Sequence, residues 1–505
     1  MKITPDTNVP EKYREQVGLI KKGRIKLNIT KPATINDGII SLEESNHKDL
    51  LRLFENAAIA GRFMKFIPAS GAATRMSSNL FSVFKKDCSL ADLELMAKEG
   101  DQKAKFASTF MNGIRKFAFF PQLELAIKKS GLSVDQLLSS GNFHDLFDFV
   151  LTEKGLNLSE LPKALLRFHR YENEVRTAFE EHLVESIKSI SCIEKKVILH
   201  LTISQKFQKQ FEELLKELRA KYSQYQLEVE FSSQDENTNT IALSCDLQMI
   251  FDENGNLLTR PGGHGTLLKN LDNLKGDLVL IKNIDNIPFD RNDEESIKPR
   301  KLLSGYLVHL QKQIFFLINK LIDESSPEET LGLAEQFIKN YLCFSIRESY
   351  KNYSNKLKKD YLLKILNRPL RVCGMVKNAG EPGGGPFWVF DKEGNESLQI
   401  VEQSQFTDDQ MDILKESTHF NPVDMVCALK NYSGRNFNLF NYRDELAYFI
   451  GNKTYNGEVI TTFEYPGLWN GGMANWNTVF VEVPASTFTP VKEVNDLLKP
   501  VHQPD

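Results

Sequence analysis

The hydrophobic positions of the chain follow two different periods, and their arrangement predicts an α/β protein. An apolar run at 63–67 predicts a buried strand, and the β-branched content of 195–204 and 226–233 predicts two further strands. A long helical pattern separates the second run from the third, so these two form a β–α–β unit with parallel strands. A fourth run, 276–286, predicts a strand that is almost fully apolar until it ends in Asn-Ile-Asp-Asn.

Helical patterns dominate the rest of the first 370 residues, at 41–60, about 77–190 and about 298–366. Helix starts are predicted from capping residues: Ser41 with Glu44, Ser133 with Gln136, and Ser326 with Pro327 and Glu329. From Arg371 the chain returns to short strands and turns. The patterns therefore predict a mostly parallel mixed sheet with two large helical insertions, at about 77–190 and 298–366.

The predicted organisation has three parts. We expect an N-terminal helical segment at 1–61, a core at 62–430 that contains both insertions, and a C-terminal strand and loop segment at 431–505 that completes the core. Ligands of such sheets bind outside the carboxyl ends of the strands. Three loops are expected there: 68–76, 231–240 and 283–287.

Composition narrows the possible partners. The 505 residues carry a net charge of −4, with 41% hydrophobic and 26% charged residues, as in soluble globular proteins. This balance gives no electrostatic basis for binding nucleic acid. No apolar run has membrane-spanning length, and the N-terminus lacks a signal-peptide core. Six dispersed cysteines without a CxxC pair argue against a zinc site or a disulfide framework. We expect a cytoplasmic protein, and no protein partner is evident.

Two glycine-rich stretches carry candidate chemistry. In PASGAATR (68–75), small residues let backbone N–H groups approach a phosphate, and Arg75 can bind phosphate oxygens. The alternative is a tight strand–helix turn with a surface arginine. In RPGGHG (260–265), His264 can donate to a phosphate or a carbonyl from a turn that lies against a flat ligand. The alternative is a mobile turn with a solvent-exposed histidine.

Two further positions suggest phosphate or metal binding. Asp285 ends a buried strand, where several α/β enzymes hold Mg²⁺ through one carboxylate and substrate phosphates. Alternatively, it caps the following loop. Lys377 precedes a glycine-rich bend at 380–385 and can present its ammonium to a phosphate. Alternatively, this bend is a flexible connection before a strand.

Taken in order, these stretches resemble the UDP-sugar pyrophosphorylases of the UTP–glucose-1-phosphate and UDP-N-acetylhexosamine types, within a bacterial family whose domain has no known function. The resemblance covers most of 62–498. The matching stretches are 69–76, 231–234, 261–265 and 283–286, then Lys377 with 383–385, 398–405 with Glu402, 420–424 with Asn421, and 483–498 with Lys492. It implies a GT-A-like nucleotidyltransferase fold, as in nucleotide-diphospho-sugar transferases.

The chain departs from the family pattern in its glycine loop. Ser70 and Ala73 stand where the family has glycines, and the family's Pro-Lys after Thr-Arg is not clearly present. Lys85 lies at a plausible spacing for that lysine, with Lys86 as a competitor. Catalysis depends on whether one of these lysines reaches the triphosphate.

The resemblance implies that a sugar 1-phosphate attacks the α-phosphorus of a nucleoside triphosphate, with UTP expected, and that pyrophosphate leaves. It implies the following roles: Asp285 binds Mg²⁺ or Mn²⁺; Arg75 and Lys85 face the pyrophosphate; Lys377 and Lys492 hold the other phosphates; Ala69, Gly71, Thr74, Gln234, Gly262, Gly263 and His264 bind the nucleotide; Gly384, Glu402 and Asn421 bind the sugar. Three alternatives stay open: a non-catalytic nucleotide or nucleotide-sugar binding protein, a scaffold without a ligand, and a GT-A glycosyltransferase, which usually needs an Asp-x-Asp pair that NIDNI lacks.

Overall fold

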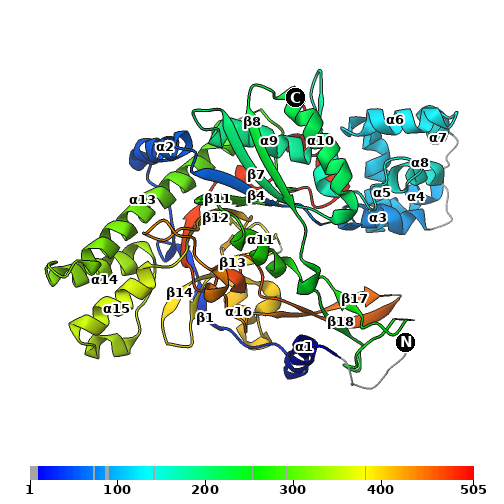
Figure 1. Cartoon of the computed structure of the whole chain (residues 1–505). Coiled ribbons are helices and arrows are strands. Elements are labelled where there is room, and N and C mark those ends of the chain that lie inside the picture. Colours follow the sequence, from blue (N-terminus) through cyan, green and yellow to red (C-terminus); the bar gives the residue numbers. More distant parts are fainter. Residues whose placement is uncertain are drawn as a thin grey trace. The chain divides into compact units, whose positions relative to one another are not determined.

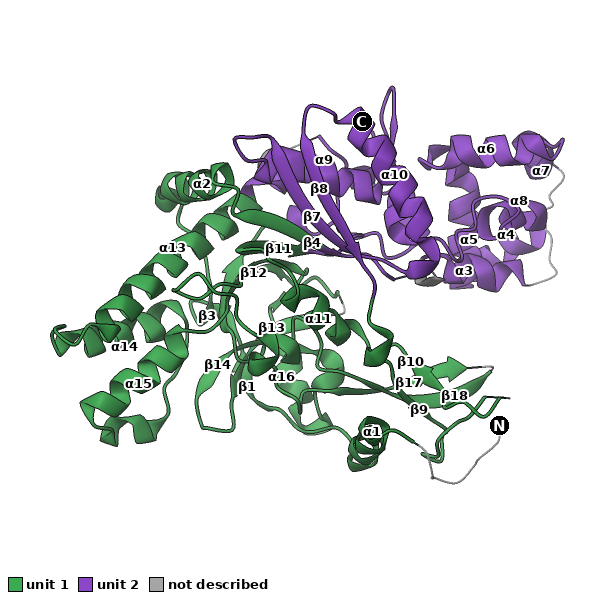
Figure 2. Cartoon of the chain, viewed as in Figure 1, with its two compact units in different colours: residues 1–66, 234–281, 299–485 green, residues 67–233, 282–298, 486–505 purple. Residues whose placement is uncertain are grey.

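The computed structural model describes residues 9–71, 74–85, 90–139, 143–252, 254–291, 293–381, 383–455 and 457–504. The chain forms two compact units, coloured separately in Figure 2. Unit 1 comprises 1–66, 234–281 and 299–485, and unit 2 comprises 67–233, 282–298 and 486–505. Each unit is thus assembled from three stretches that are far apart in the sequence.

Unit 1 is built on a mixed sheet with the strand order β2-β3-β19-β12-β16-β11-β4. These strands are β2 (Thr34–Ile35), β3 (Gly38–Ile40), β19 (Asn477–Glu482), β12 (Leu370–Lys377), β16 (Asp424–Ala428), β11 (Leu278–Lys282) and β4 (Phe63–Pro68). Figure 1 labels β12, β11 and β4 of this sheet. Most neighbours are parallel, whereas β16 and the short β15 (His419–Phe420) pair with β12 in antiparallel fashion. The predicted mostly parallel mixed sheet is confirmed.

Two antiparallel sheets complete the strands of unit 1. One has the order β1-β13-β14, with β1 (Asn28–Pro32), β13 (Gly384–Phe390) and β14 (Glu396–Glu402). The other has the order β10-β9-β18-β17, with β10 (Thr259–Arg260), β9 (Thr240–Leu243), β18 (Glu458–Glu464) and β17 (Phe449–Tyr455). The helices of unit 1 are α1 (Glu11–Lys22), α2 (Glu44–Ile59), α11 (Leu267–Asp272), α13 (Lys298–Ile322), α14 (Glu329–Tyr341), α15 (Asn355–Leu366) and α16 (Met411–Lys415).

Unit 2 contains the predicted β–α–β unit. Strands β7 (Lys196–Thr202) and β8 (Gln226–Ser232) are parallel and joined by α10 (Gln208–Lys221). The hairpin of β5 (Arg167–Arg170) and β6 (Val175–Thr177) leads into α9 (Ala178–Ile190). The other helices are α3 (Thr74–Phe84), α4 (Leu90–Lys98), α5 (Gln102–Gly113), α6 (Phe120–Lys129), α7 (Val134–Ser139), α8 (Phe143–Leu151) and α12 (Asp293–Ser296).

One hydrophobic core holds unit 2 together. The apolar positions of α8 face it at helical spacing, and Phe143, Phe147 and Val150 are fully or almost fully buried. The same core includes Ile284 and Val491, which come from two other stretches of the unit. The chain around Asp285 and the chain before Lys492 are therefore anchored in one apolar interior.

Two of the three predicted helix starts are wrong. Ser133 and Gln136 do form a reciprocal capping box, with hydrogen bonds of 2.8 and 3.2 Å. By contrast, α2 begins at Glu44 after Glu43, because the Ser41 hydroxyl donates instead to Glu482. Helix α14 begins at Glu329 and has no capping side chain. For Ser41, a hydrogen bond to a residue distant in the sequence replaces the predicted capping bond.

Within the described residues, no helix combines the length and apolar character needed to cross a membrane. The described cysteines at 192, 245, 343, 373 and 427 are all free thiols, and Cys88 lies outside the described residues.

Candidate functional site

In unit 2, the stretch 283–286 that follows β11 lies beside the C-terminal stretch 487–491. The Val491 N–H donates to the Asp285 carbonyl at 2.9 Å, and Asn286 and Pro490 form an antiparallel bridge. The buried Asn286 amide adds two bonds: its Oδ1 accepts from the Thr489 N–H at 2.8 Å, and its Nδ2 donates to the Thr487 carbonyl at 3.3 Å. These bonds place Asp285 next to the segment that carries Lys492.

The Asp285 carboxylate has a cationic partner that the sequence did not reveal. Lys163 Nζ lies 2.7 Å from Asp285 Oδ2 and donates to the Val491 carbonyl at 2.7 Å. The Lys163 and Asp285 side chains are only 14% and 22% exposed, so solvent screens this ion pair incompletely. Lys163 begins a short 3₁₀ turn that ends at Leu165, and no motif in the local sequence points to a partner for this lysine.

Helix α9 contacts the chain at the end of β11. The buried His182 ring donates from Nε2 to the Ile284 carbonyl at 3.0 Å. Three residues further along the helix, Glu185 pairs with Lys282 at 2.7 Å, with side chains 9% and 1% exposed. Both contacts fix the backbone on either side of Asn283, so they position the Asp285 carboxylate without touching it.

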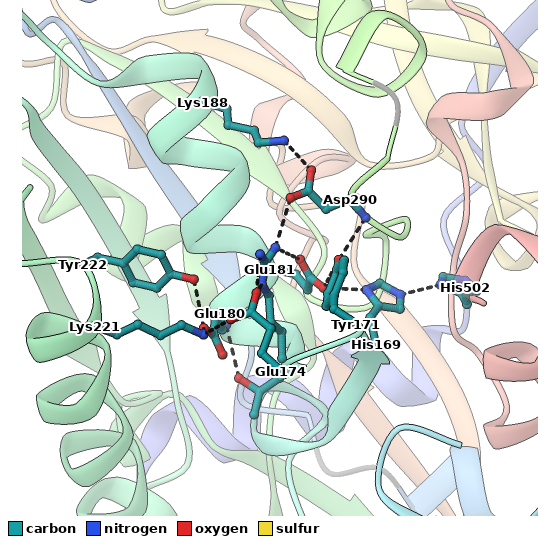
Figure 3. Close-up of polar contacts among 12 residues, drawn as sticks. His169, Tyr171, Glu174, Glu180, Glu181, Lys188, Lys221, Tyr222, Asp290 and His502 are labelled. Carbon is teal, nitrogen blue, oxygen red and sulfur yellow. Dashed lines mark hydrogen bonds and ion pairs between the residues drawn. The ribbon is translucent and has the colours of Figure 1, made fainter. Parts of the chain in front are cut away.

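A second buried network holds the C-terminal segment in unit 2 (Figure 3). His169 Nδ1 donates to Glu181 at 2.8 Å, and His169 Nε2 lies 2.9 Å from His502 Nδ1. The Tyr171 hydroxyl donates to the same Glu181 oxygen at 2.7 Å, and Arg176 bridges Glu181 to Asp290. This network ties the last residues of the chain to the β5–β6 hairpin and α9.

This network predicts a pH-dependent stability. Burial and the neighbouring His169 lower the pKa of His502 from 6.5 to about 3. In the unfolded chain His502 binds a proton below pH 6.5, whereas in the folded chain it stays neutral, so its contribution is complete above pH 6.5 and is lost as the pH falls towards 3. Between pH 7 and 5 this costs about 2 kcal/mol.

We therefore expect the His502→Gln variant to lose about 2 kcal/mol less stability than the wild type between pH 7 and 5. Urea unfolding of the full chain at both pH values measures this difference. Equal pH dependence of the two proteins would contradict the assignment.

The predicted glycine loop also belongs to unit 2. Ala69 is buried and its N–H donates to the Thr202 carbonyl at 3.0 Å. Gly71 is exposed, and no described atom lies within 4 Å of a Cβ built on it. Ala72, Ala73 and the side chains of Thr74 and Arg75 lie outside the described residues. The loop thus has open space at Gly71, as a backbone that receives a ligand requires.

Helix α3, which follows this loop, reaches the C-terminal segment. The Asn79 amide donates to the Glu493 carboxylate at 2.8 Å. Lys85, after the last turn of α3, is exposed and its Nζ lies 4.7 Å from the centre of the Phe81 ring. Lys492 is exposed as well, and its Nζ lies 5.5 Å from the centre of the Phe488 ring. Its ammonium has no acidic partner among the described residues.

In unit 1, a chain of contacts joins five predicted residues from five stretches. Lys377 pairs with His419 across β12 and β15. Two residues on, the Asn421 N–H donates to the Gly384 carbonyl at 2.7 Å, and Gly384 pairs with Glu402 across β13 and β14. Glu402 Oε1 lies 3.4 Å from His264 Nε2. Residues that the resemblance assigns to the sugar, to a phosphate and to the nucleotide therefore lie along one chain of contacts in this unit.

The environment of His264 defines its tautomer. The Leu468 N–H donates to His264 Nδ1 at 3.1 Å, so Nδ1 carries no proton. The neutral ring therefore carries its proton on Nε2, which faces Glu402. The Trp469 indole stacks on the imidazole, with 4.2 Å between ring centroids.

The loop 464–470 that holds His264 was missed by the sequence analysis. An added Cβ at Gly263, where φ is +79°, would collide with the Glu464 carboxylate, and one at Gly265 would collide with the Pro466 carbonyl. The glycines of PGGHG thus allow a close approach of two protein segments. The paired Pro-Gly and Gly-Gly steps near Trp469 and Trp476 were the available signal for this loop.

Gly467 offers a stability test of this packing. A Cβ there would lie 2.5 Å from His264 Cε1 and 2.8 Å from Asn470 Oδ1. Because stacking and a hydrogen bond hold the ring, we expect Gly467→Ala to destabilise the protein by about 1–3 kcal/mol. Gly451→Ala is the matched control, since no described atom lies within 4 Å of its Cβ. Calorimetry of both variants measures their melting temperatures. Equal values would contradict the close packing of Gly467 against His264.

Two other predicted nucleotide-binding residues lie in unit 1. Gln234 is half-buried, and its Nε2 has no hydrogen-bond partner among the described residues. Gly262 is buried, and a Cβ added there would lie 2.7 Å from the Thr238 carbonyl oxygen, too close to fit. A cavity of 960 Å³ in the same unit is lined by Lys31, Arg347, Trp388 and others, but by no predicted site residue.

The donor set around Asp285 does not suit the Mg²⁺ that the resemblance implies. Protein-bound Mg²⁺ lies about 2.0–2.1 Å from one or two carboxylates, together with water and substrate phosphates. Here an ammonium lies 2.7 Å from the carboxylate oxygen. In the described part of the chain, no group of three or more His, Cys, Asp or Glu could hold a metal ion. A metal on Asp285 Oδ2 would have to displace Lys163.

Comparison with protein families assigns the chain to one of them. The model of the family described as Domain of unknown function (DUF4301) matches residues 2–503. The chain belongs to this family. A search of the curated proteins finds no match.

Several solved structures are similar over most of the chain. The UDP-N-acetylglucosamine pyrophosphorylase from Trypanosoma brucei has 13% identity, covers 96% of this chain and 74% of its own, and gives a TM-score of 0.47. A variant of the UDP-glucose pyrophosphorylase from Leishmania major has 11% identity, the same coverage and a TM-score of 0.43. The UDP-glucose phosphorylase from Trypanosoma brucei has 13% identity, covers 97% and 76%, and gives 0.43.

Proposed function

We propose that this member of the family is a sugar-1-phosphate nucleotidyltransferase with a GT-A-like core. It would use a nucleoside triphosphate, expected to be UTP, and form a nucleoside-diphosphate sugar and pyrophosphate. The observation that carries the proposal is the pairing of the Asp285 strand end with the Val491 segment in unit 2. It supports a phosphate site made from 283–286 and 483–498, two of the stretches that resemble the pyrophosphorylase motifs.

The proposed reaction needs no protein nucleophile. An oxygen of the sugar 1-phosphate attacks the α-phosphorus and forms a new P–O bond. The bond between the α-phosphorus and the bridging oxygen breaks, and pyrophosphate leaves with the electron pair. Catalysis then consists of positioning and of stabilising negative charge, for which fixed ammonium groups are suited.

In unit 2, the resemblance suggests roles for residues toward the phosphates and the base. Lys492, exposed and without an acidic partner among the described residues, would contact the α-phosphate or the sugar phosphate. Arg75 and Lys85 would face the leaving pyrophosphate, Gly71 would approach the base, and Ala69 and Thr74 would shape the same loop.

In unit 1, the resemblance suggests roles for residues toward the sugar, its phosphate and the nucleotide. Beside Gly384, Glu402 would accept hydrogen bonds from sugar hydroxyls, and Asn421 would exchange hydrogen bonds with them. Lys377 would lie near the sugar phosphate. Gln234, Gly262, Gly263 and His264 would contact the nucleotide. Asn421 Nδ2 and Asn470 Oδ1 are buried and lack partners among the described residues, which supports a polar ligand or water at this cluster.

Formation of pyrophosphate from UTP and a panel of sugar 1-phosphates tests the proposal. We expect pyrophosphate release that depends on both substrates and is strongly reduced in the Asp285→Ala variant. Binding of UMP without pyrophosphate release from any sugar 1-phosphate would instead support a non-catalytic nucleotide-binding protein. Absence of both binding and turnover would refute the proposed function.

A further inference from the structure

The ammonium of Lys163 fills the place of a cation beside Asp285. An ammonium has three N–H donors. Two of them reach Asp285 Oδ2 and the Val491 carbonyl, each at 2.7 Å. In the described part of the chain the third has no partner, and 14% of the side chain is exposed. One N–H of a fixed positive charge is thus available to a ligand.

The backbone beneath Lys163 is rigidly held. Ala164 and Leu166 are buried in the core of unit 2, and the Leu166 carbonyl accepts from the Ala178 N–H at 3.1 Å. That hydrogen bond joins the Lys163 turn to the start of α9, the helix that also positions Ile284 through His182. The lysine and its carboxylate are therefore placed by the same helix, as a preorganised charge pair requires.

We propose that Lys163 is the resident cation of this site and replaces a divalent metal at Asp285. Asp285 and the Val491 carbonyl orient the ammonium, and its third N–H contacts a nucleotide phosphate. The identity of the ligand as a nucleotide phosphate rests on the proposed function. The claim that Asp285 does not bind a metal does not rest on it. Any Mg²⁺ that a triphosphate carries is part of the substrate and is not bound by Asp285.

Two possible roles of the ion pair predict different effects of replacing Lys163. If the pair only stabilises the fold, removing the Lys163 charge lowers the melting temperature and leaves ligand binding unchanged. If Lys163 contacts phosphate, its removal weakens ligand binding in addition to any loss of melting temperature.

The binding experiment uses the full chain, UMP as the probe, and titration calorimetry in buffer with EDTA or with Mg²⁺. UMP carries one phosphate and binds Mg²⁺ weakly, so a metal effect reports on the protein. We expect wild-type affinity to differ less than about threefold between the two buffers, and Lys163→Met to bind at least roughly tenfold more weakly. Lys163→Arg keeps the charge and should stay close to wild type. Lys206→Met, at an exposed ion pair of unit 2, is the matched control.

A crystallographic readout does not depend on the nucleotide. Crystals of the wild type soaked in Mn²⁺ should show no anomalous density at Asp285, and Lys163 should stay paired with it. A Mn²⁺ ion bound to the Asp285 carboxylate with Lys163 displaced would overturn the inference. So would unchanged UMP affinity of Lys163→Met. If the wild type binds no UMP in either buffer, the proposed function fails, and the Mn²⁺ soak alone judges the metal question.

Discussion

Replacing Asp285 by alanine is expected to lower turnover of UTP and sugar 1-phosphate by about 10²–10³-fold, with little change in melting temperature. The loss follows because Lys163 would keep only the Val491 carbonyl as a partner and its ammonium would no longer be fixed. By analogy with an oxyanion-hole donor, one such transition-state contact is worth about 2.7–4 kcal/mol. Steady-state kcat measurements check the size of the effect.

Asp148→Ala is the matched control for this variant. Asp148 also pairs with a lysine in unit 2, at 3.1 Å, and its side chain is 29% exposed against 22% for Asp285. It lies on α8, away from the strand end, so its loss should leave kcat within about twofold. Near-normal turnover of Asp285→Ala, or an equal loss in both variants, would remove Asp285 from the mechanism.

Replacing Lys282 by methionine is expected to destabilise the protein by about 3–5 kcal/mol. The side chains of Lys282 and Glu185 are 1% and 9% exposed, so the variant removes an ammonium from beside a buried carboxylate. Urea unfolding measures the change. The double variant Lys282→Met with Glu185→Leu should recover part of the loss, because it removes both charges of this pair.

Lys196→Met provides the control for the buried pair. Lys196 pairs with Glu228 at 2.8 Å in the same unit, but the two side chains are 30% and 41% exposed. Solvent screens such a pair, and we expect a loss below about 1 kcal/mol. Similar losses for Lys282→Met and Lys196→Met would contradict the burial argument.

The strands of the central sheet could be predicted from sequence because buried parallel strands have continuous apolar runs. The β5–β6 hairpin could not, since its sequence is polar and charged and its burial depends on pairing His169 with Glu181. The division into interleaved units also escaped prediction. It arises from contacts between stretches such as 282–298 and 486–505, which leave no local periodic signal.

The candidate site was predictable where a motif places a polar residue at a strand end. Asp285 is such a case, whereas Lys492 was expected only from the resemblance. The structure places their segments side by side in unit 2. Lys163 was not predictable, because its importance comes from two distant partners, Asp285 and the Val491 carbonyl. Trp469 was missed for the same reason, since only the folded loop brings it onto His264.

A crystal structure of the full chain with UMP tests the central claim most directly. The account predicts that the phosphate lies within about 3 Å of Lys163 Nζ or Lys492 Nζ, with Asp285 still paired to Lys163. A phosphate bound elsewhere, with neither ammonium in contact, would contradict it.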